Sequence, residues 1–107
     1  LMAINSETIE STIRDYVAEV KKDMPIDRVV LFGSHAKGTA TEFSDVDICF
    51  FSDSFVSMRS VDIVTNLLKI AGKYKSVCIE PRAFPTSEIA KNNPFIREIL
   101  ATGKEIE

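Results

Sequence analysis

The sequence has few of the residues that build metal clusters and no long apolar run. It contains one histidine, His35, and two cysteines, Cys49 and Cys78. A single histidine excludes a histidine metal cluster. Because the cysteines lie in separate apolar runs without the spacing of zinc ligands, we expect two buried thiols. No stretch approaches the roughly eighteen apolar residues of a membrane span, and residues 1–11 lack the pattern of a signal peptide. We therefore expect a cytoplasmic protein without a membrane partner.

The sequence also lacks an excess of positive charge. Thirteen Lys and Arg residues oppose sixteen Asp and Glu residues, for a formal net charge of −3. Proteins that bind nucleic acid usually carry a basic surface, so nucleic acid is not the expected partner. The 107 residues contain no repeat and no linker-like segment. We expect one domain over residues 1–107, which is too small for a separate recognition domain, so a large substrate must be recognised through a partner or an outer face.

Hydrophobic periodicity predicts helices alternating with strands. Strands are expected at 28–32, 45–51 and 76–80, the last ended by Pro81. Helices are expected at 6–23, 60–73, 86–91 and 94–102, with caps at Ser6, Ser60 and Asn93. A tight turn into one or two helical turns is expected at 33–38, with Ser34 as its cap and Gly38 at its end. The sum is an α/β (α+β) domain with a small mixed sheet of three or more strands and helices packed on one side of it.

Apolar positions predict the buried face of each helix. For the helix at 60–73 the expected buried stripe consists of Val61, Val64, Leu68 and Ala71. For the last helix the expected buried residues are Phe95, Ile96, Ile99 and Leu100.

Three acidic residues stand in otherwise apolar strands: Asp45, Asp47 and Glu80. Aspartate is a poor strand residue, and a half-buried carboxylate is costly unless a cation compensates it. Alternation places Asp45 and Asp47 on one face, about 6.6 Å apart at the Cα atoms. A third carboxylate from another strand would complete a cluster. Because Mg²⁺ prefers a few carboxylates together with water and phosphate oxygens, the pattern indicates a metal site shared with a nucleotide.

Gly33 and Ser34 follow the first predicted strand and form the other half of this pattern. Glycine lets the backbone approach a ligand closely, while a helix N-terminus and a serine hydroxyl donate hydrogen bonds to phosphate oxygens. A Gly-Ser pair, a gap of ten residues and an Asp-x-Asp pair would match by chance in on the order of one in a thousand sequences of this length. The combination therefore indicates a nucleotide site.

This pattern resembles the minimal nucleotidyltransferases of the DNA polymerase beta-like superfamily. The match includes Ser44 just before the acidic pair, and Glu80 corresponds to the family's third carboxylate. The resemblance implies that Asp45 and Asp47 hold two Mg²⁺ ions, that Glu80 contacts the catalytic ion, and that Gly33 and Ser34 bind the β- and γ-phosphates of a nucleoside triphosphate. The family often has arginine after Gly-Ser. Here His35 and Lys37 flank Ala36, and Lys37 would supply the positive charge.

The resemblance also implies a reaction, in which a hydroxyl attacks the α-phosphorus and pyrophosphate leaves. Small members of the family are commonly antitoxins that pair with a HEPN-type toxin, which implies transfer of AMP from ATP to a toxin tyrosine. Transfer to a small molecule such as an aminoglycoside, and a non-catalytic binding module with a vestigial site, remain alternatives. A homo-oligomer is also left open.

Each residue of the motif also has a purely structural interpretation. Gly33 and Ser34 by themselves fit an ordinary turn with a capping serine, and Asp47 fits an edge strand that carries charge. Glu80 fits a solvated strand end whose surface partner is Arg82. The roles of His35 and Arg82 stay undetermined.

Overall fold

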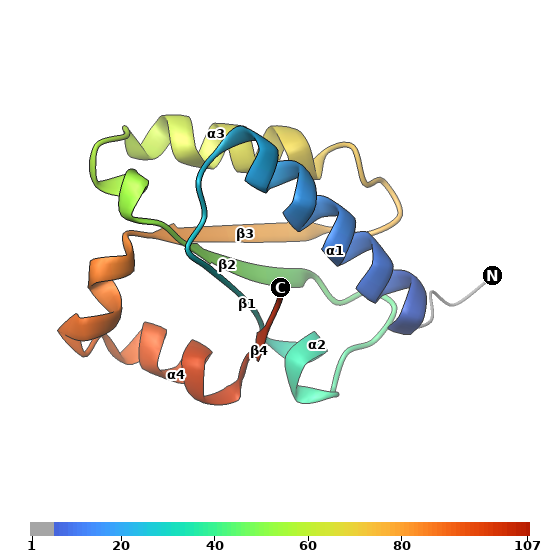
Figure 1. Ribbon diagram of the computed structural model, residues 1–107. Coiled ribbons are helices and arrows are strands. Elements are labelled where there is room, and N and C mark those ends of the chain that lie inside the picture. Colours follow the sequence, from blue (N-terminus) through green and yellow to red (C-terminus); the bar gives the residue numbers. More distant parts are fainter. Residues whose placement is uncertain (1–5) are drawn as a thin grey trace.

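The computed structural model describes residues 6–107, which form a four-stranded mixed sheet with helices on both faces (Figure 1). Four elements make the sheet, in the order β3-β2-β1-β4: β1 (Arg28–Phe32), β2 (Val46–Phe51), β3 (Ile79–Phe84) and β4 (Lys104–Glu105). Strand β1 is antiparallel to both β2 and β4, whereas β2 and β3 are parallel. The predicted fold class is confirmed.

Residues 6–107 also form four α-helices and two short 3-10 helices, of which α1 precedes the first strand and the others lie between strands. They are α1 (Ser6–Asp23), α2 (Ser34–Lys37), η1 (Asp53–Val56), α3 (Ser60–Ala71), η2 (Thr86–Lys91) and α4 (Pro94–Thr102). The side chain of Ser6, predicted to cap α1, lies outside those described. The predicted cap of α4 is confirmed, because Oδ1 of Asn93 accepts a hydrogen bond from the backbone N–H of Phe95 at 2.9 Å. The residue that caps α3 is Arg59 rather than Ser60.

The prediction that helices pack on one side of the sheet is wrong. Val46, Ile48 and Phe50 of β2 pack in one buried cluster with residues of α1 and α3. The alternate residues Cys49 and Phe51 pack in a second cluster with residues of α4, which covers the opposite face (Figure 1). A central strand that is buried on both faces must be covered on both, and the unbroken apolar run from Ile48 to Phe51 carries that signal.

The predicted buried stripe of α3 is also wrong, apart from Ala71. The helix buries Ile63, Leu67, Ile70 and Ala71. Val61, Val64 and Leu68 are instead 56%, 44% and 51% exposed. Apolar residues recur at helical spacing on more than one side of α3, so periodicity alone does not choose the buried side, and packing against α1 and the sheet decides it.

Strand β3 begins and ends later than predicted. Pro81 lies within the strand, as the register partner of Ile48, instead of ending it. Because β3 is an edge strand, a missing backbone N–H can face outward without breaking the sheet.

The first residue of α4's predicted buried face is exposed. Phe95 is 42% exposed, although its ring lies 5.9 Å from that of Phe32 and 6.1 Å from that of Phe84 between centroids. Ile96 and Ile99 are buried as predicted, and Leu100 is half-buried.

Candidate functional site

The turn after β1 brings Gly33 against the carboxylate of Asp47. In the antiparallel β1–β2 pair, Phe32 is the register partner of Asp47, so Gly33 follows directly beside it. Gly33 has a φ of 75°, and a Cβ placed there would overlap Oδ2 of Asp47 and lie 3.2 Å from its Cγ. Only glycine satisfies both the backbone conformation and the space. Two residues that the sequence placed in one motif are therefore in direct contact.

Helix α2 begins one residue earlier than the sequence suggested. Gly33 is its N-cap, and the carbonyl oxygen of Gly33 accepts hydrogen bonds from the N–H groups of Ala36 and Lys37, both at 3.1 Å. The prediction of Ser34 as the cap is wrong, because the positive φ of glycine lets Gly33 take that place. Within residues 6–107 the Ser34 hydroxyl has no hydrogen-bond partner.

Lys37, predicted to face phosphate, lies in an exposed ion pair. Its Nζ is 3.7 Å from Oε1 of Glu98 on α4, with the two side chains 47% and 67% exposed. Exposed pairs of this kind contribute less than about 1 kcal/mol, so a phosphate could take the place of Glu98 at little cost.

The acidic residues meet at one end of the β2–β3 pair. Asp47 and Glu80 are register partners on parallel strands, so their side chains leave the same face of the sheet. Asp45 directly precedes β2, where the Val46 N–H donates a 2.8 Å hydrogen bond to the carbonyl oxygen of Cys78. The parallel register thus joins residues that are far apart in the sequence.

The thiol of Cys78 lies near the three carboxylates, and they affect its pKa. Its pKa is raised first by a hydrogen bond with the Asp45 side chain, then by burial, and then by the negative charges of Asp45, Glu80 and Asp47. All three acids are therefore close enough to this thiol for their charges to act on it. Cys78 is exposed, so the prediction of a buried thiol is wrong for this residue and right for Cys49.

Asp47 sits in an environment that disfavours its charge. Burial of the carboxyl and then the charge of Asp45 raise its pKa, while Arg82 and His35 oppose that shift. Arg82 is the register partner of Cys49 and so shares the sheet face of Asp47. Within residues 6–107 it forms no ion pair with Glu80, the partner that the sequence suggested.

A complete ligand set is not assembled. Within residues 6–107, no three His, Cys, Asp or Glu side chains are close enough together to hold a metal ion. Nor does any of Asp45, Asp47 and Glu80 take part in an ion pair within this range. The three acids share one end of the sheet as separate carboxylates.

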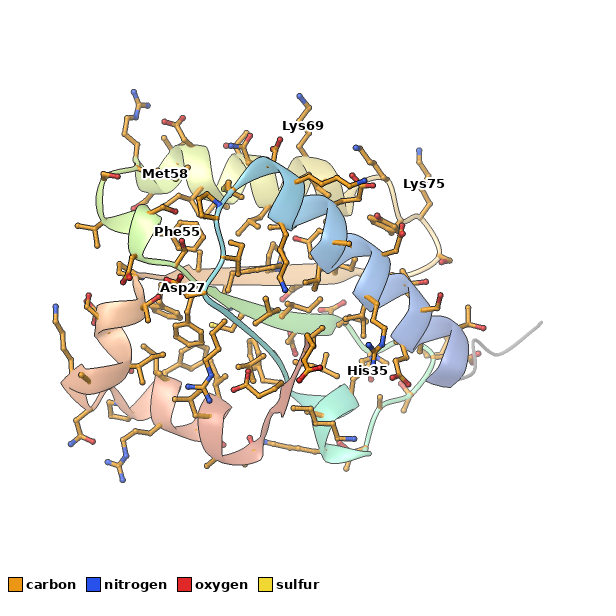
Figure 2. The ribbon with its side chains drawn as sticks, in the orientation of Figure 1. Asp27, His35, Phe55, Met58, Lys69 and Lys75 are labelled. Carbon is orange, nitrogen blue, oxygen red and sulfur yellow. The ribbon has the colours of Figure 1, made fainter. Side chains whose placement is uncertain are left out.

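A cavity of about 530 Å³ adjoins this end of the sheet. Its walls come from α1, β1, α2, the 40–44 loop, β2, the segment 76–78 before β3 and residues 104–106, and they include His35, Ser44 and Cys78. None of the predicted site residues lines this cavity, namely Gly33, Ser34, Lys37, Asp45, Asp47 and Glu80. His35 points toward α1 from α2 (Figure 2). The loop is held by the Ser44 hydroxyl, which accepts a 2.9 Å hydrogen bond from the N–H of Thr41. Local sequence patterns do not predict this cavity, because its walls come from seven separate segments.

Comparison with known proteins establishes the family. A profile of the nucleotidyltransferase domain matches residues 12–102. Two proteins of Methanocaldococcus jannaschii, provisionally named protein adenylyltransferases MJ0604 and MJ0141, are 31% and 34% identical. The first alignment covers 89% of this chain and 94% of that protein, and the second covers 88% and 98%. The chain belongs to the nucleotidyltransferase domain family, and the prediction of a nucleotidyltransferase enzyme is confirmed.

The fold agrees with a solved member of this class. A crystal structure from Sulfolobus solfataricus, provisionally described as a nucleotidyltransferase, superposes with a TM-score of 0.59 at 20% identity and covers 98% of this chain and 90% of that one.

Within residues 6–107, no helix has the length and apolar character needed to cross a membrane.

Proposed function

We propose that this protein transfers AMP from ATP to a hydroxyl group of a partner protein. The observation that carries the proposal is the contact of Gly33 with the carboxylate of Asp47, with Asp45 two residues earlier, just before β2. It joins a glycine turn to an acidic pair, an arrangement that suits phosphoryl chemistry on a metal-bound nucleotide.

The donor set fits Mg²⁺. Burial and then the charge of Asp45 raise the pKa of Asp47, and neither carboxylate takes part in an ion pair within residues 6–107, so a divalent cation would stabilise both charges. Asp45 and Asp47 would hold the two ions of the proposal, with Glu80 contacting one of them. Bound Mg²⁺ supplies charge neutralisation and polarisation at the phosphoryl oxygens.

The turn after β1 would hold the rest of the nucleotide. The close backbone at Gly33 and the free hydroxyl of Ser34 would donate to the β- and γ-phosphates, and Lys37 would leave Glu98 to neutralise part of their charge. These groups orient the α-phosphorus toward the acidic end of the sheet.

The chemistry is a displacement at that phosphorus. The acceptor oxygen forms a bond to the α-phosphorus, the bond to the bridging oxygen breaks, and pyrophosphate leaves with its electron pair. Glu80, which shares the strand face of Asp47, would accept the hydroxyl proton, alone or together with Asp47.

A protein hydroxyl is the acceptor that the relatives favour, because two of them are provisionally named protein adenylyltransferases. We propose a tyrosine of a HEPN-type toxin, which gives this cytoplasmic protein an antitoxin role. A small chain has little surface of its own to select a substrate, so a docked protein would supply specificity.

The alternative to transfer is a binding module that neutralises its partner without chemistry. Co-expression of a HEPN-type toxin with wild-type or Asp47→Asn protein, followed by peptide mass spectrometry of the toxin, separates the two. AMP on a toxin tyrosine with wild type only supports transfer. An unmodified toxin in a stoichiometric complex with both proteins supports the binding module.

A further inference from the structure

The sheet face that carries Asp47 presents its side chains in rows that run across the strands. The register pairs of β1, β2 and β3 give an acidic row that consists of Phe32, Asp47 and Glu80. The next row consists of Val30, Cys49 and Arg82. Val30 and Cys49 are buried in the cluster with α4, whereas Asp47 is half-buried and Glu80 is exposed. The acidic row is therefore the part of this face that is open to a substrate.

Phe95 of α4 borders the acidic row. Its ring lies 5.9 Å from the ring of Phe32 and 6.1 Å from the ring of Phe84, measured between centroids. Phe32 and Phe84 are at diagonal positions of the same face, on β1 and β3, so the ring of Phe95 spans the rows between them. Despite these contacts Phe95 is 42% exposed. An aromatic surface that the core does not cover thus lies beside the acids.

Arg82 borders the acidic row from the edge strand. It lies two residues after Glu80 on the same face of β3. It is exposed and forms no ion pair within residues 6–107. Its charge still acts on the site: burial and the charge of Asp45 raise the pKa of Asp47, and Arg82 opposes that rise. The guanidinium is therefore free to contact a ligand, and guanidinium groups stack on aromatic rings.

The order of the strands indicates which substrate these two residues would meet. The Gly-Ser turn follows β1, whereas Glu80 and Arg82 lie on β3, across the central strand β2. In the proposed reaction the turn holds the pyrophosphate that leaves. The attacking and leaving oxygens are roughly in line at the phosphorus, so the acceptor approaches from the side opposite the turn. That side is the β3 side.

We propose that Phe95 and Arg82 bind the acceptor and select the aromatic hydroxyl of a tyrosine over an aliphatic hydroxyl. The phenol ring packs against the exposed part of the Phe95 ring, and the guanidinium of Arg82 lies over its face. The phenol oxygen then forms the bond to the α-phosphorus as pyrophosphate leaves, and its proton goes to Glu80. An aliphatic hydroxyl makes neither ring contact. This inference rests on the proposed function and adds the residues that recognise the acceptor.

Steady-state transfer from ATP labelled at the α-phosphate to a HEPN-type partner tests both residues. Phe95→Leu keeps an apolar side chain but removes the ring, and Arg82→Gln removes the guanidinium. Each raises the KM for the partner about tenfold and leaves the KM for ATP unchanged. Arg82→Lys restores only part of the loss, because an ammonium lacks the planar group. Arg97→Gln, at another exposed arginine, is the matched control and behaves like wild type. Circular dichroism verifies that each variant is folded.

A titration followed by NMR tests recognition without the reaction. N-acetyltyrosinamide shifts the ring signals of Phe95 and the side-chain signals of Arg82 in the wild-type protein, whereas N-acetylserinamide does not. In Phe95→Leu the shifts at Arg82 become smaller. Equal shifts with the two compounds, or no shift at either residue, overturn the inference.

The kinetic outcomes separate this inference from the proposed function. A rise in the KM for ATP instead of the partner assigns the Phe95 ring to the nucleobase and overturns the inference. Unchanged KM values in both variants overturn it too, as does equally fast transfer to a partner whose acceptor tyrosine is replaced by serine. In each of these cases transfer itself still stands. Absence of transfer to every acceptor contradicts the proposed function, and the NMR titration then decides whether the two residues recognise an aromatic hydroxyl.

Discussion

Gly33 and Asp47 lie in contact across the β1–β2 pair, although fourteen positions separate them in the sequence. The contact follows from the antiparallel register, which places Phe32 opposite Asp47 and leaves Gly33 at the side of the carboxylate. The turn after β1 and the acidic strand are thereby held in one fixed geometry, which is what the proposed catalysis by positioning needs.

Replacing Gly33 tests this contact. We expect Gly33→Ala to lower transfer at least a hundredfold, because a Cβ would displace the Asp47 carboxylate, and to lower the melting temperature because φ is 75°. Gly38→Ala is the control. Gly38 also has a positive φ, of 76°, but open space around its Cα. It should cost about 1 kcal/mol of stability and leave transfer near wild type. Equal loss of transfer in the two folded variants would contradict the role of the contact.

Removing the charge of Asp47 should separate function from stability. Asp47→Asn relieves the repulsion with Asp45 and the cost of burying a carboxylate, so we expect transfer to disappear while the melting temperature at neutral pH stays equal or rises. Glu42→Gln, a change at an exposed acid in the preceding loop, should alter neither. If Asp47→Asn unfolds the protein, Asp47 is a structural residue and the proposed metal site is wrong.

The hydrogen bonds of Asp27 should make the unfolding free energy depend on pH in the acidic range. Its Oδ2 accepts hydrogen bonds from the Thr86 hydroxyl and the Asp53 N–H, both at 2.7 Å, and joins the start of β1 to η1 and η2 (Figure 2). The hydrogen bond from Thr86 is the main cause of a lowered pKa at Asp27, and the hydrogen bond from Asp53 lowers it further. A lowered carboxyl pKa contributes stability above the unfolded value of about 3.9, and this contribution is lost as pH falls through the folded value.

The measurement is the unfolding free energy of wild type and Asp27→Asn in a pH series. Their difference should be constant near neutral pH and shrink below about pH 4. Asp23→Asn, at an exposed residue near the end of α1, should track wild type throughout. A difference between wild type and Asp27→Asn that persists unchanged to pH 2 would assign the effect to packing rather than to the carboxylate.

Lys37 should affect nucleotide affinity more than turnover. If Lys37 leaves Glu98 for phosphate, Lys37→Ala raises the KM for ATP several-fold with a smaller change in kcat, and Glu98→Gln lowers that KM by about twofold. Lys91→Ala, which removes a lysine of a similar exposed pair in η2, serves as the control. Unchanged KM values in both Lys37→Ala and Glu98→Gln would remove Lys37 from the site.

Local sequence patterns predict most helices and strands and the Gly-Ser and Asp-x-Asp motif. They do not predict features that depend on tertiary packing, such as the buried side of a helix or the edge strand of the sheet. Gly33 and Asp47 were assigned together because strand alternation and glycine conformation are local properties. The buried side of α3 is not predictable locally, because Ile63 and Val64 are both apolar and packing against α1 and the sheet distinguishes them. Pro81 was expected to end β3, since no local signal shows which strand lies at the edge.

The surroundings of the site depended most on tertiary structure. Cys78 was expected to be buried because its neighbours are apolar. The parallel β2–β3 register instead leaves it exposed beside Asp45, and it also gives Arg82 its influence on Asp47. Register and edge position come from pairing between distant segments, which a single sequence does not display.

Nucleotidyl transfer itself is the central claim, and incubation with ATP labelled at the α- or γ-phosphate tests it most directly. With Mg²⁺ and a HEPN-type partner, the account predicts label on the partner from α-labelled ATP only, and loss of that label with EDTA or Asp47→Asn but not with Glu42→Gln. Label from γ-labelled ATP, transfer that survives Asp47→Asn, or no transfer by a protein that still binds its partner tightly would contradict it.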